Sequence, residues 1–294
     1  MHLDDFISRH ELPAIYAKCA ERCYLPFADW LYERSRSSDA GTFVLGINGA
    51  QGTGKSTCAD LVNEYLSDEY DLAVVVLSID DIYRTRRERE LLARTVHPLL
   101  ATRGVPGTHD VDVGLQTIAQ LKSLGPGSAI RIPRFDKSSD DRFPENEWPL
   151  VTGPVDLVIF EGWCVASAAC DLEELEKPIN ALERDEDADA VWRIYVNEKL
   201  HKEYRTLFDT LDALLFLKAP DFDSVYQWRL QQEYELRAKS GEDARAIMSD
   251  EQVARFIQFY ERITRWNIEH LPEVANAVID LDTQHRAVSL VFSD

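Results

Sequence analysis

The chain has 294 residues, 45% of them hydrophobic, and a net charge of −20 at neutral pH. This length is enough for one large α/β domain or two small ones, and the negative charge argues against nucleic acid or an anionic membrane as the main partner. No run of about 18 apolar residues occurs, so we expect no membrane-spanning segment.

The N-terminal segment 1–38 has apolar side chains at helix-like spacing, including Phe27, Trp30 and Leu31, and is predicted to form a helical extension. It lacks the basic stretch and apolar core of a secretory signal. The five cysteines of the chain form no CxxC pair and are odd in number, which favours free thiols over a disulfide framework. We therefore expect a cytoplasmic protein. A polar break over 35–41 follows the extension.

A phosphate-binding loop follows the first predicted strand. The apolar run 42–47 is typical of a buried strand, and 56–66 has the pattern of a helix. Between them, Gly49-Ala50-Gln51-Gly52-Thr53-Gly54-Lys55-Ser56 matches the pattern GxxxxGK[ST] in full. Backbone N–H groups and the helix N-terminus of such a unit bind nucleotide phosphates. We expect Lys55 to reach the β- and γ-phosphates of ATP and Ser56 to hold Mg²⁺, in a site that extends to Thr57.

Further strands and helices alternate along the rest of the chain. Strands are predicted at 73–79, 129–135, 156–160, 213–217, 278–281 and 287–292. Helices are predicted at 84–94, 110–124, 222–239 and 249–270, the last opening with the capping-box pattern Ser249-Asp250-Glu251-Gln252. Apolar strands separated by helices predict an α/β fold with a doubly wound, mostly parallel sheet covered on both faces.

We predict one domain of the P-loop NTPase type over residues 1–294. Its core comprises 41–165 and 206–294, and an acidic helical insert occupies 166–205. Ligands of such sheets bind beyond the carboxyl ends of the strands, so the catalytic residues are expected at that edge.

Acidic residues end two of the predicted strands at this edge. Asp80 and Asp81 follow the second strand, which places them beside the phosphate-binding loop. One of them can accept the proton of an attacking hydroxyl, while an Asp in this place can also cap the next helix. Glu161 ends the strand 156–160 and is expected, together with Asp80 and Ser56, to hold the metal ion or its water.

Basic and polar residues further along the chain are candidates for binding an anionic acceptor and the transferred phosphate. Arginine suits a carboxylate because its planar fork forms paired hydrogen bonds. The candidates for the acceptor are Asp81, Tyr83, Arg103, His109, Asp110, Arg134, Lys137 and Arg142. Arg229 and Arg237 lie two turns apart on one predicted helix and can close over the phosphate, or pair with Glu233. Each of these charges can instead be solvated.

Several segments match a known family in their order along the chain. They are LGINGAQGTGKS at 45–56, SIDDIY at 78–83, RGVPGTHD at 103–110, PRFDKS at 133–138, EGWC at 161–164, NALERDED at 180–187, WRL at 228–230 and MSDEQV at 248–253. With these segments the chain resembles the D-glycerate 3-kinase family, within the wider group of phosphoribulokinase, uridine kinase and pantothenate kinase P-loop enzymes.

The resemblance implies MgATP-dependent phosphorylation of D-glycerate to 3-phosphoglycerate. It implies that Asp80 is the catalytic base, that the helix with Arg229 and Arg237 is a lid, and that PRFDKS is an acceptor-side loop. Ile82 departs from the family, which more often has phenylalanine there, and this difference bears on packing only. No role for the insert follows from the resemblance.

Two other functions remain open on the sequence. A kinase of pantothenate, a nucleoside or a sugar phosphate would use the same ATP site, but a nucleoside pocket should offer aromatic and amide groups, whereas the acceptor segments offer Arg, Lys and Asp. A nucleotide-hydrolysing switch protein would need a partner surface, for which the insert is the only candidate. The sequence therefore favours an ATP-dependent kinase of a small hydroxy acid.

Overall fold

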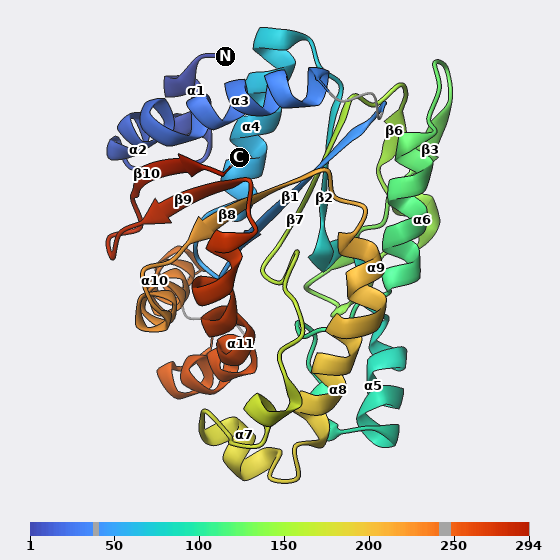
Figure 1. Ribbon diagram of the computed structural model, residues 1–294, viewed down its shortest axis with the longest axis vertical. Coiled ribbons are helices and arrows are strands. Elements are labelled where there is room, and N and C mark those ends of the chain that lie inside the picture. Colours follow the sequence, from blue (N-terminus) through green and yellow to red (C-terminus); the bar gives the residue numbers. More distant parts are fainter. Residues whose placement is uncertain (38–40, 241–247, 294) are drawn as a thin grey trace.

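The computed structural model describes residues 1–37, 41–240 and 248–293, so residues 38–40 of the predicted polar break and residue 294 lie outside the described residues. At its centre is a six-stranded sheet of order β10-β9-β8-β1-β7-β2 (Figure 1). These strands are β1 (Phe43–Gly49), β2 (Val74–Ser78), β7 (Leu157–Gly162), β8 (Ala213–Lys218), β9 (Ala277–Leu281) and β10 (Ala287–Phe292). All neighbours pair in parallel except β10, which is antiparallel to β9.

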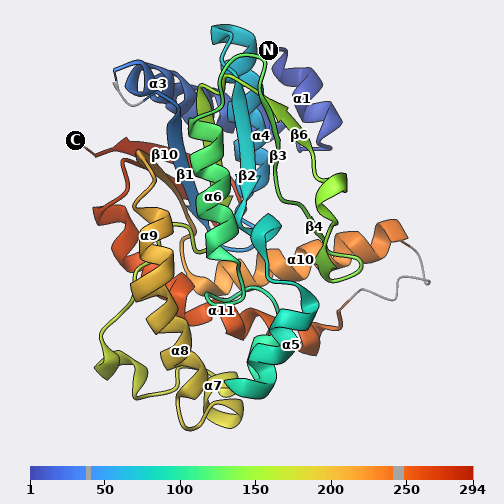
Figure 2. The same ribbon diagram turned by 90° about the vertical axis from the view of Figure 1, so that its right-hand side faces the viewer.

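Helices cover both faces of this sheet, which confirms the predicted doubly wound α/β fold. On one face α4 (Lys55–Tyr70) packs against β1, β2 and β7, and on the other lies α6 (Val111–Lys122) (Figure 2). β1 and β7 are buried along their whole length. Their apolar runs, 43–47 in β1 and 157–160 in β7, follow from this double covering, because neither face of the strand meets water.

The remaining helices lie at the N-terminus and beyond the carboxyl ends of the strands. The N-terminal extension is helical as predicted, with α1 (Leu3–Arg9), α2 (Ile15–Cys19), a π-helical turn (Ala20–Tyr24) and α3 (Leu25–Arg36). The others are α5 (Arg86–Thr95), α7 (Ala181–Glu186), α8 (Val191–Lys199), a π-helical turn (Leu200–Tyr204), α9 (Arg205–Phe208), α10 (Phe222–Ser240) and α11 (Asp250–His270). Short 3₁₀ turns cover Ile79–Ile82, Pro98–Ala101, Glu145–Glu147, Leu172–Leu175 and Leu271–Glu273. None of the helices in the described ranges is long and apolar enough to cross a membrane.

One predicted strand of the sheet is wrong. Residues 129–135 do not join the central sheet, because β3 (Ala129–Arg131) pairs antiparallel with β6 (Leu150–Thr152) in a small separate ribbon, and β4 (Phe135–Asp136) pairs with β5 (Asp141–Arg142) in another. The physical reason is exposure. Ala129 and Arg131 are both open to solvent, whereas a central parallel strand must bury both of its faces.

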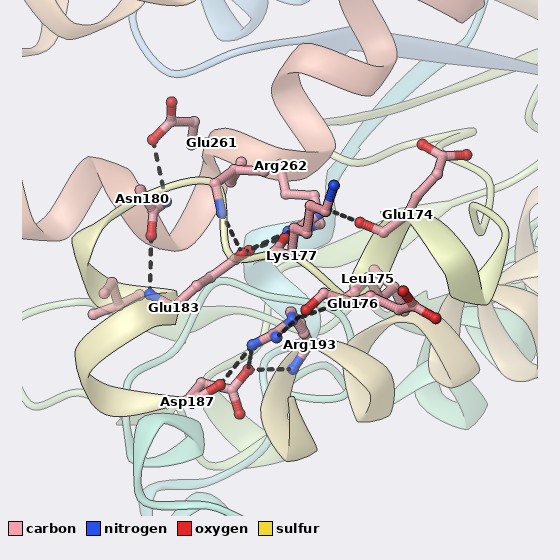
Figure 3. A network of polar contacts seen from close by, with 12 residues as sticks. Glu174, Leu175, Glu176, Lys177, Asn180, Glu183, Asp187, Arg193, Glu261 and Arg262 are labelled. Atoms are coloured by element: carbon pink, nitrogen blue, oxygen red, sulfur yellow. Dashed lines mark hydrogen bonds and ion pairs between the residues drawn. The ribbon is translucent and has the colours of Figure 1, made fainter. Parts of the chain in front are cut away.

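The acidic segment 166–205 is held together by buried ion pairs. The Arg262 guanidinium of α11 binds the Glu183 carboxylate at 2.6 Å and the carbonyls of Glu174 and Lys177 at 2.8 Å (Figure 3). Glu183 is only 1% exposed. Within the segment itself, Arg193 is 3% exposed and binds the Asp187 carboxylate at 2.9 Å. Glu183 and Asp187 therefore do not belong to a solvated face: Glu183 ties the segment to α11, and Asp187 ties the segment to itself.

Candidate active site

The phosphate-binding loop has the geometry that its sequence predicts. Gly49 ends β1, and Gly52 and Gly54 have positive φ angles of 81° and 83°. A Cβ atom on Gly52 would lie 2.9 Å from Cβ of Trp228, so glycine is required there on two grounds. Gly54 precedes the first residue of α4 and provides no side-chain cap. The first N–H groups of α4 thus remain available for an anion, as a phosphate site needs.

Lys55, Ser56 and Glu161 lie together beside this loop. Nζ of Lys55 donates to the Ala50 carbonyl at 3.1 Å, and Oγ of Ser56 donates to Oε1 of Glu161 at 3.1 Å. Burial lowers the pKa of Lys55, although the charges of Glu161 and Asp80 oppose this. Burial likewise raises the pKa of Glu161, and the Lys55 charge opposes that. The opposite charges of Lys55 and Glu161 thus each favour the ionised form of the other.

The oxygens of Ser56 and Glu161 are donors of the type that Mg²⁺ prefers. Within the described part of the chain, no group of three or more His, Cys, Asp or Glu side chains could hold a metal by itself. This fits Mg²⁺, which commonly takes one or two protein ligands and completes its shell with phosphate oxygens and water.

Asp80 lies in the 3₁₀ turn that follows β2. The sequence places it directly beside the loop, but β7 intervenes between β1 and β2, so Glu161 is the nearer acidic strand end. Oδ1 of Asp80 accepts from the Tyr83 hydroxyl at 2.7 Å, and Oδ2 accepts from Nζ of Lys137 at 2.7 Å. Burial alone would raise the pKa of Asp80, but the charge and hydrogen bond of Lys137 and the hydrogen bond of Tyr83 lower it. Asp80 is thus held as a carboxylate.

A single cleft of about 920 Å³ contains the loop, Asp80 and part of the predicted acceptor site. Its lining includes Gln51, Gly52, Lys55, Ser56, Asp80, Tyr83, Arg103, Lys137, Glu161 and Arg229 from the sequence-predicted set. Three of the cations in it are paired with acids of the protein itself. Arg103 forms an ion pair with Asp140, Lys137 pairs with Asp80, and Arg229 pairs with Glu233.

Asp81 and Arg134 are placed outside the lining of the cleft. The Asp81 side chain is buried, and its carboxylate accepts from Arg134 at 3.0 Å and from the backbone N–H of Phe135 at 3.3 Å. Burial raises the pKa of Asp81, against the charge of Arg134. This pair fixes the start of the acceptor-side loop.

His109, Asp110 and Arg142 also lie behind the cleft wall. His109 is fully buried, and burial lowers its pKa to about 3, so its ring is neutral at physiological pH. Asp110 is the N-cap of α6 and pairs with Arg142 at 3.1 Å. Arg142 also donates to the Tyr83 carbonyl at 3.1 Å. In the structure these three residues hold the loops that carry Tyr83 and Lys137.

The two predicted lid arginines have different surroundings. Arg229 lines the cleft, where its guanidinium stacks over the Phe256 ring 5.6 Å from the centroid. Arg237 is exposed and donates to the Met248 carbonyl at 3.0 Å, which ties α10 to the start of α11. The helical spacing that the sequence predicts is confirmed, but only Arg229 lies in the wall of the cleft.

Two charged residues of the cleft, Arg89 and Asp140, are missed by the sequence reasoning. Arg89 of α5 is 1% exposed and donates to the carbonyls of Ala101 at 2.9 Å and Asp140 at 2.7 Å. It also pairs with the Asp140 carboxylate at 3.0 Å. Arg89 lies in a run of charged residues that is typical of a solvated helix, and nothing in that run distinguishes it from its neighbours. Asp140 is the acid that Arg89 and Arg103 share.

No family model matches the chain. Its similar proteins are kinases. The uncharacterised kinase mug58 of Schizosaccharomyces pombe is 34% identical over 78% of this chain and 82% of its own length. The chloroplastic D-glycerate 3-kinase of Arabidopsis thaliana is 31% identical over 76% of this chain, which spans 47% of that longer protein.

Among solved structures, the D-glycerate 3-kinase from Cryptococcus neoformans superposes with a TM-score of 0.76 and 27% identity. The match covers 92% of this chain and 99% of the fungal one. These matches extend over most of this chain, and its phosphate-binding loop and acidic strand ends are those of a kinase. The chain therefore belongs to the D-glycerate 3-kinase family of ATP-dependent P-loop kinases.

Proposed function

We propose that the protein transfers the γ-phosphoryl group of MgATP to a hydroxyl group of D-glycerate, forming 3-phosphoglycerate and ADP. The observation that carries this proposal is the sharing of one cleft by the phosphate-binding loop, the ionised Asp80 and the cations Arg103 and Lys137. Relatives that are named for D-glycerate support the choice of acceptor.

The nucleotide is bound by residues Gly49 to Thr57. Backbone N–H groups of the loop and of the first turn of α4 surround the β-phosphate, and Lys55 neutralises charge on the γ-phosphate. Ser56 and Glu161, with Asp80 close by, hold Mg²⁺ or its water. When bound, the ion supplies charge neutralisation at the phosphate oxygens. Arg229 contributes a further positive charge from the cleft wall.

Asp80 acts as the general base. The acceptor oxygen forms a bond to the γ-phosphorus as the bond from that phosphorus to the β–γ bridging oxygen breaks, and ADP leaves with the electron pair. The hydroxyl proton goes to Asp80. Tyr83 orients the carboxylate through its hydrogen bond to Oδ1. Burial raises the pKa of Tyr83 well above its usual range, so it remains a donor.

Arg103 and Lys137 bind the carboxylate of the acceptor. Both line the cleft, and both are paired with carboxylates of the protein, Asp140 and Asp80. An acceptor carboxylate can replace one of these partners at similar geometry, whereas a neutral nucleoside cannot. Asp81, His109, Asp110, Arg134 and Arg142 support this site through the loops that they fix.

The decisive experiment is an acceptor panel. The purified protein is incubated with MgATP and D-glycerate, L-glycerate, pantothenate, uridine or ribulose 5-phosphate, and ADP release is followed. We expect turnover with D-glycerate far above the rate without an acceptor. Turnover with another compound alone would move the assignment to another acceptor, and equal ADP release without any acceptor would identify a nucleotide-hydrolysing switch instead.

A further inference from the structure

The segment 166–205 meets the wall of the active site at the end of α8 and at the turn that follows it, where the Tyr204 side chain makes hydrogen bonds. Tyr204 ends the π-helical turn between α8 and α9, a type of turn that often occurs at functional sites. Its fully buried hydroxyl accepts from the backbone N–H of Gly107 at 2.9 Å and from that of His109 at 3.4 Å. The hydroxyl oxygen also lies 2.5 Å from Nδ1 of His109. Because the oxygen accepts both N–H groups, its own hydrogen is donated to Nδ1.

The backbone of this turn packs directly on the same segment. Gly107 has a φ of +98°, and a Cβ atom there would lie 2.6 Å from Cε1 of Tyr195 and 3.2 Å from Cγ of Lys199, both on α8. Any other residue would be strained at this φ angle and would have to displace the Tyr195 ring. The end of α8 and the turn that follows it thus set where residues 107–109 lie.

His109 connects this turn to the base. Its ring stacks on that of Tyr83, with centroids 4.5 Å apart and an interplanar angle of 19°. The segments that carry His109 and Tyr83 are also joined through the backbone, because the N–H of Asp110 donates to the Ile82 carbonyl at 2.7 Å. The Tyr83 hydroxyl then donates to Asp80. A shift of the His109 ring is therefore transmitted to the hydrogen bond that orients Asp80.

We propose that Tyr204 is a positioning residue of the reaction: through His109 and Tyr83, the segment 166–205 sets the orientation of the Asp80 carboxylate. This rests on the proposed function, because it takes Asp80 as the base. It gives the segment a role in catalysis without a contact to either substrate.

The first test is Tyr204→Phe, which removes only the hydroxyl. We expect kcat with the acceptor to fall about 10- to 100-fold, the size of effect that a misplacement of about 1 Å produces, while KM for ATP stays within about twofold. The matched control is Tyr195→Phe. The Tyr195 ring touches the same turn, but its hydroxyl interacts with Lys199, so kcat is expected to stay within about twofold.

A double-mutant cycle with Asp80→Asn separates this role from a general loss of structure. If Tyr204 acts through Asp80, Tyr204→Phe has no further effect on kcat once Asp80 is asparagine. The proposal is overturned if Tyr204→Phe lowers kcat by the same factor in both backgrounds, or if it behaves like Tyr195→Phe.

The outcomes also separate this proposal from the function on which it rests. Wild-type kcat in Asp80→Asn would overturn the base and the coupling together. A large loss in Asp80→Asn beside full activity in Tyr204→Phe would overturn the coupling alone. If Tyr204→Phe does not fold, His109→Phe replaces it, since it keeps a ring on Tyr83 and removes Nδ1. The same loss of kcat at unchanged KM for ATP is expected, and full activity would sink the proposal.

Discussion

Asp80 is held between a lysine and a tyrosine, and this pair of contacts decides its protonation. Lys137 and Tyr83 lower the pKa of this half-buried carboxylate, against the effect of burial, which alone would raise it. The neighbouring Asp81 has no such pair facing the cleft and instead binds Arg134 and the backbone of Phe135. Two adjacent residues of one type thus have separate tasks, which their partners determine.

The first prediction concerns this pair of aspartates. Asp80→Asn is expected to lower kcat about 10²- to 10⁴-fold, because it removes the general base, and to leave KM for ATP nearly unchanged. Asp81→Asn serves as the control, with a smaller loss of kcat and a larger loss of stability. Steady-state kinetics and urea unfolding of both variants check this. A greater loss of kcat in Asp81→Asn would reverse the two assignments.

The second prediction concerns the buried, neutral His109. Its pKa is about 3 in the folded protein against 6.5 for an exposed histidine, so the unfolded chain binds the additional proton. This stabilising contribution is complete above pH 6.5 and is lost as the pH falls toward 3, and it is worth at most on the order of 5 kcal/mol. Wild type should therefore lose stability more steeply than His109→Phe between pH 6.5 and pH 4 in urea unfolding. Parallel pH profiles would show that His109 is not held neutral.

The sequence predicts the residues that a motif defines and misses those that the fold brings together. Lys55, Ser56 and Asp80 lie in short patterns with a chemical reason for each residue, and all three line the cleft. Arg89 and Asp140 are 51 residues apart and meet only because α5 packs beside the loop before β5. His109 is the converse case, since its loop reads as exposed but is covered by the insert.

At the scale of elements, local patterns are predicted well and pairing in space is not. Both hydrogen bonds of the predicted capping box of α11 are present. The Ser249 side chain accepts from the Gln252 N–H, and the Gln252 side chain accepts from the Ser249 N–H. The insertion of β7 between β1 and β2 leaves no trace in chain order, because it depends on which edge each crossover reaches. The sequence of β3 likewise does not show that this strand pairs with β6 in a separate, exposed ribbon.

The third prediction concerns the buried pair that joins the insert to α11. Arg262→Leu leaves the Glu183 carboxylate, 1% exposed, without its partner and should lower the free energy of unfolding by about 3–5 kcal/mol. Arg255 pairs with Glu186 on the same two elements, but with 51% and 41% of these side chains exposed. Arg255→Leu is therefore the matched control, with a loss of about 1 kcal/mol or less. Equal losses in urea unfolding would show that burial of the pair contributes nothing.

At the scale of the whole molecule, the cleft does not share the negative charge of the chain. The net charge is −20, yet Lys55, Arg89, Arg103, Lys137 and Arg229 gather around one cavity. The acids in the same lining, Asp80, Asp140, Glu161 and Glu233, roughly balance these cations, so an anionic substrate meets less repulsion at the cleft than at the rest of the surface. Helices α10 and α11 contribute residues to the lining of the cleft, and together with the segment 166–205 they lie on the side of the molecule away from the N-terminal extension (Figure 1).

The fourth prediction is that nucleotide binding stabilises the whole fold. A ligand at about 100 times its Kd that binds only the folded state adds about 2.7 kcal/mol to the free energy of unfolding. MgATP should therefore raise the thermal midpoint of wild type, measured by calorimetry. Lys55→Met, which lacks the ammonium group of the phosphate site, should show a much smaller rise at the same concentration. The same rise in both proteins would place the nucleotide elsewhere.

The ion pair between Arg103 and Asp140 has a consequence for selectivity. If Arg103 binds the acceptor as proposed, the Asp140 carboxylate competes with the acceptor carboxylate for the Arg103 guanidinium. A neutral alcohol such as glycerol brings nothing that can displace it. When a hydroxy acid binds, its carboxylate replaces that of Asp140 on Arg103, with little net gain in binding free energy. We therefore expect the site to reject uncharged alcohols and to bind its acid only weakly.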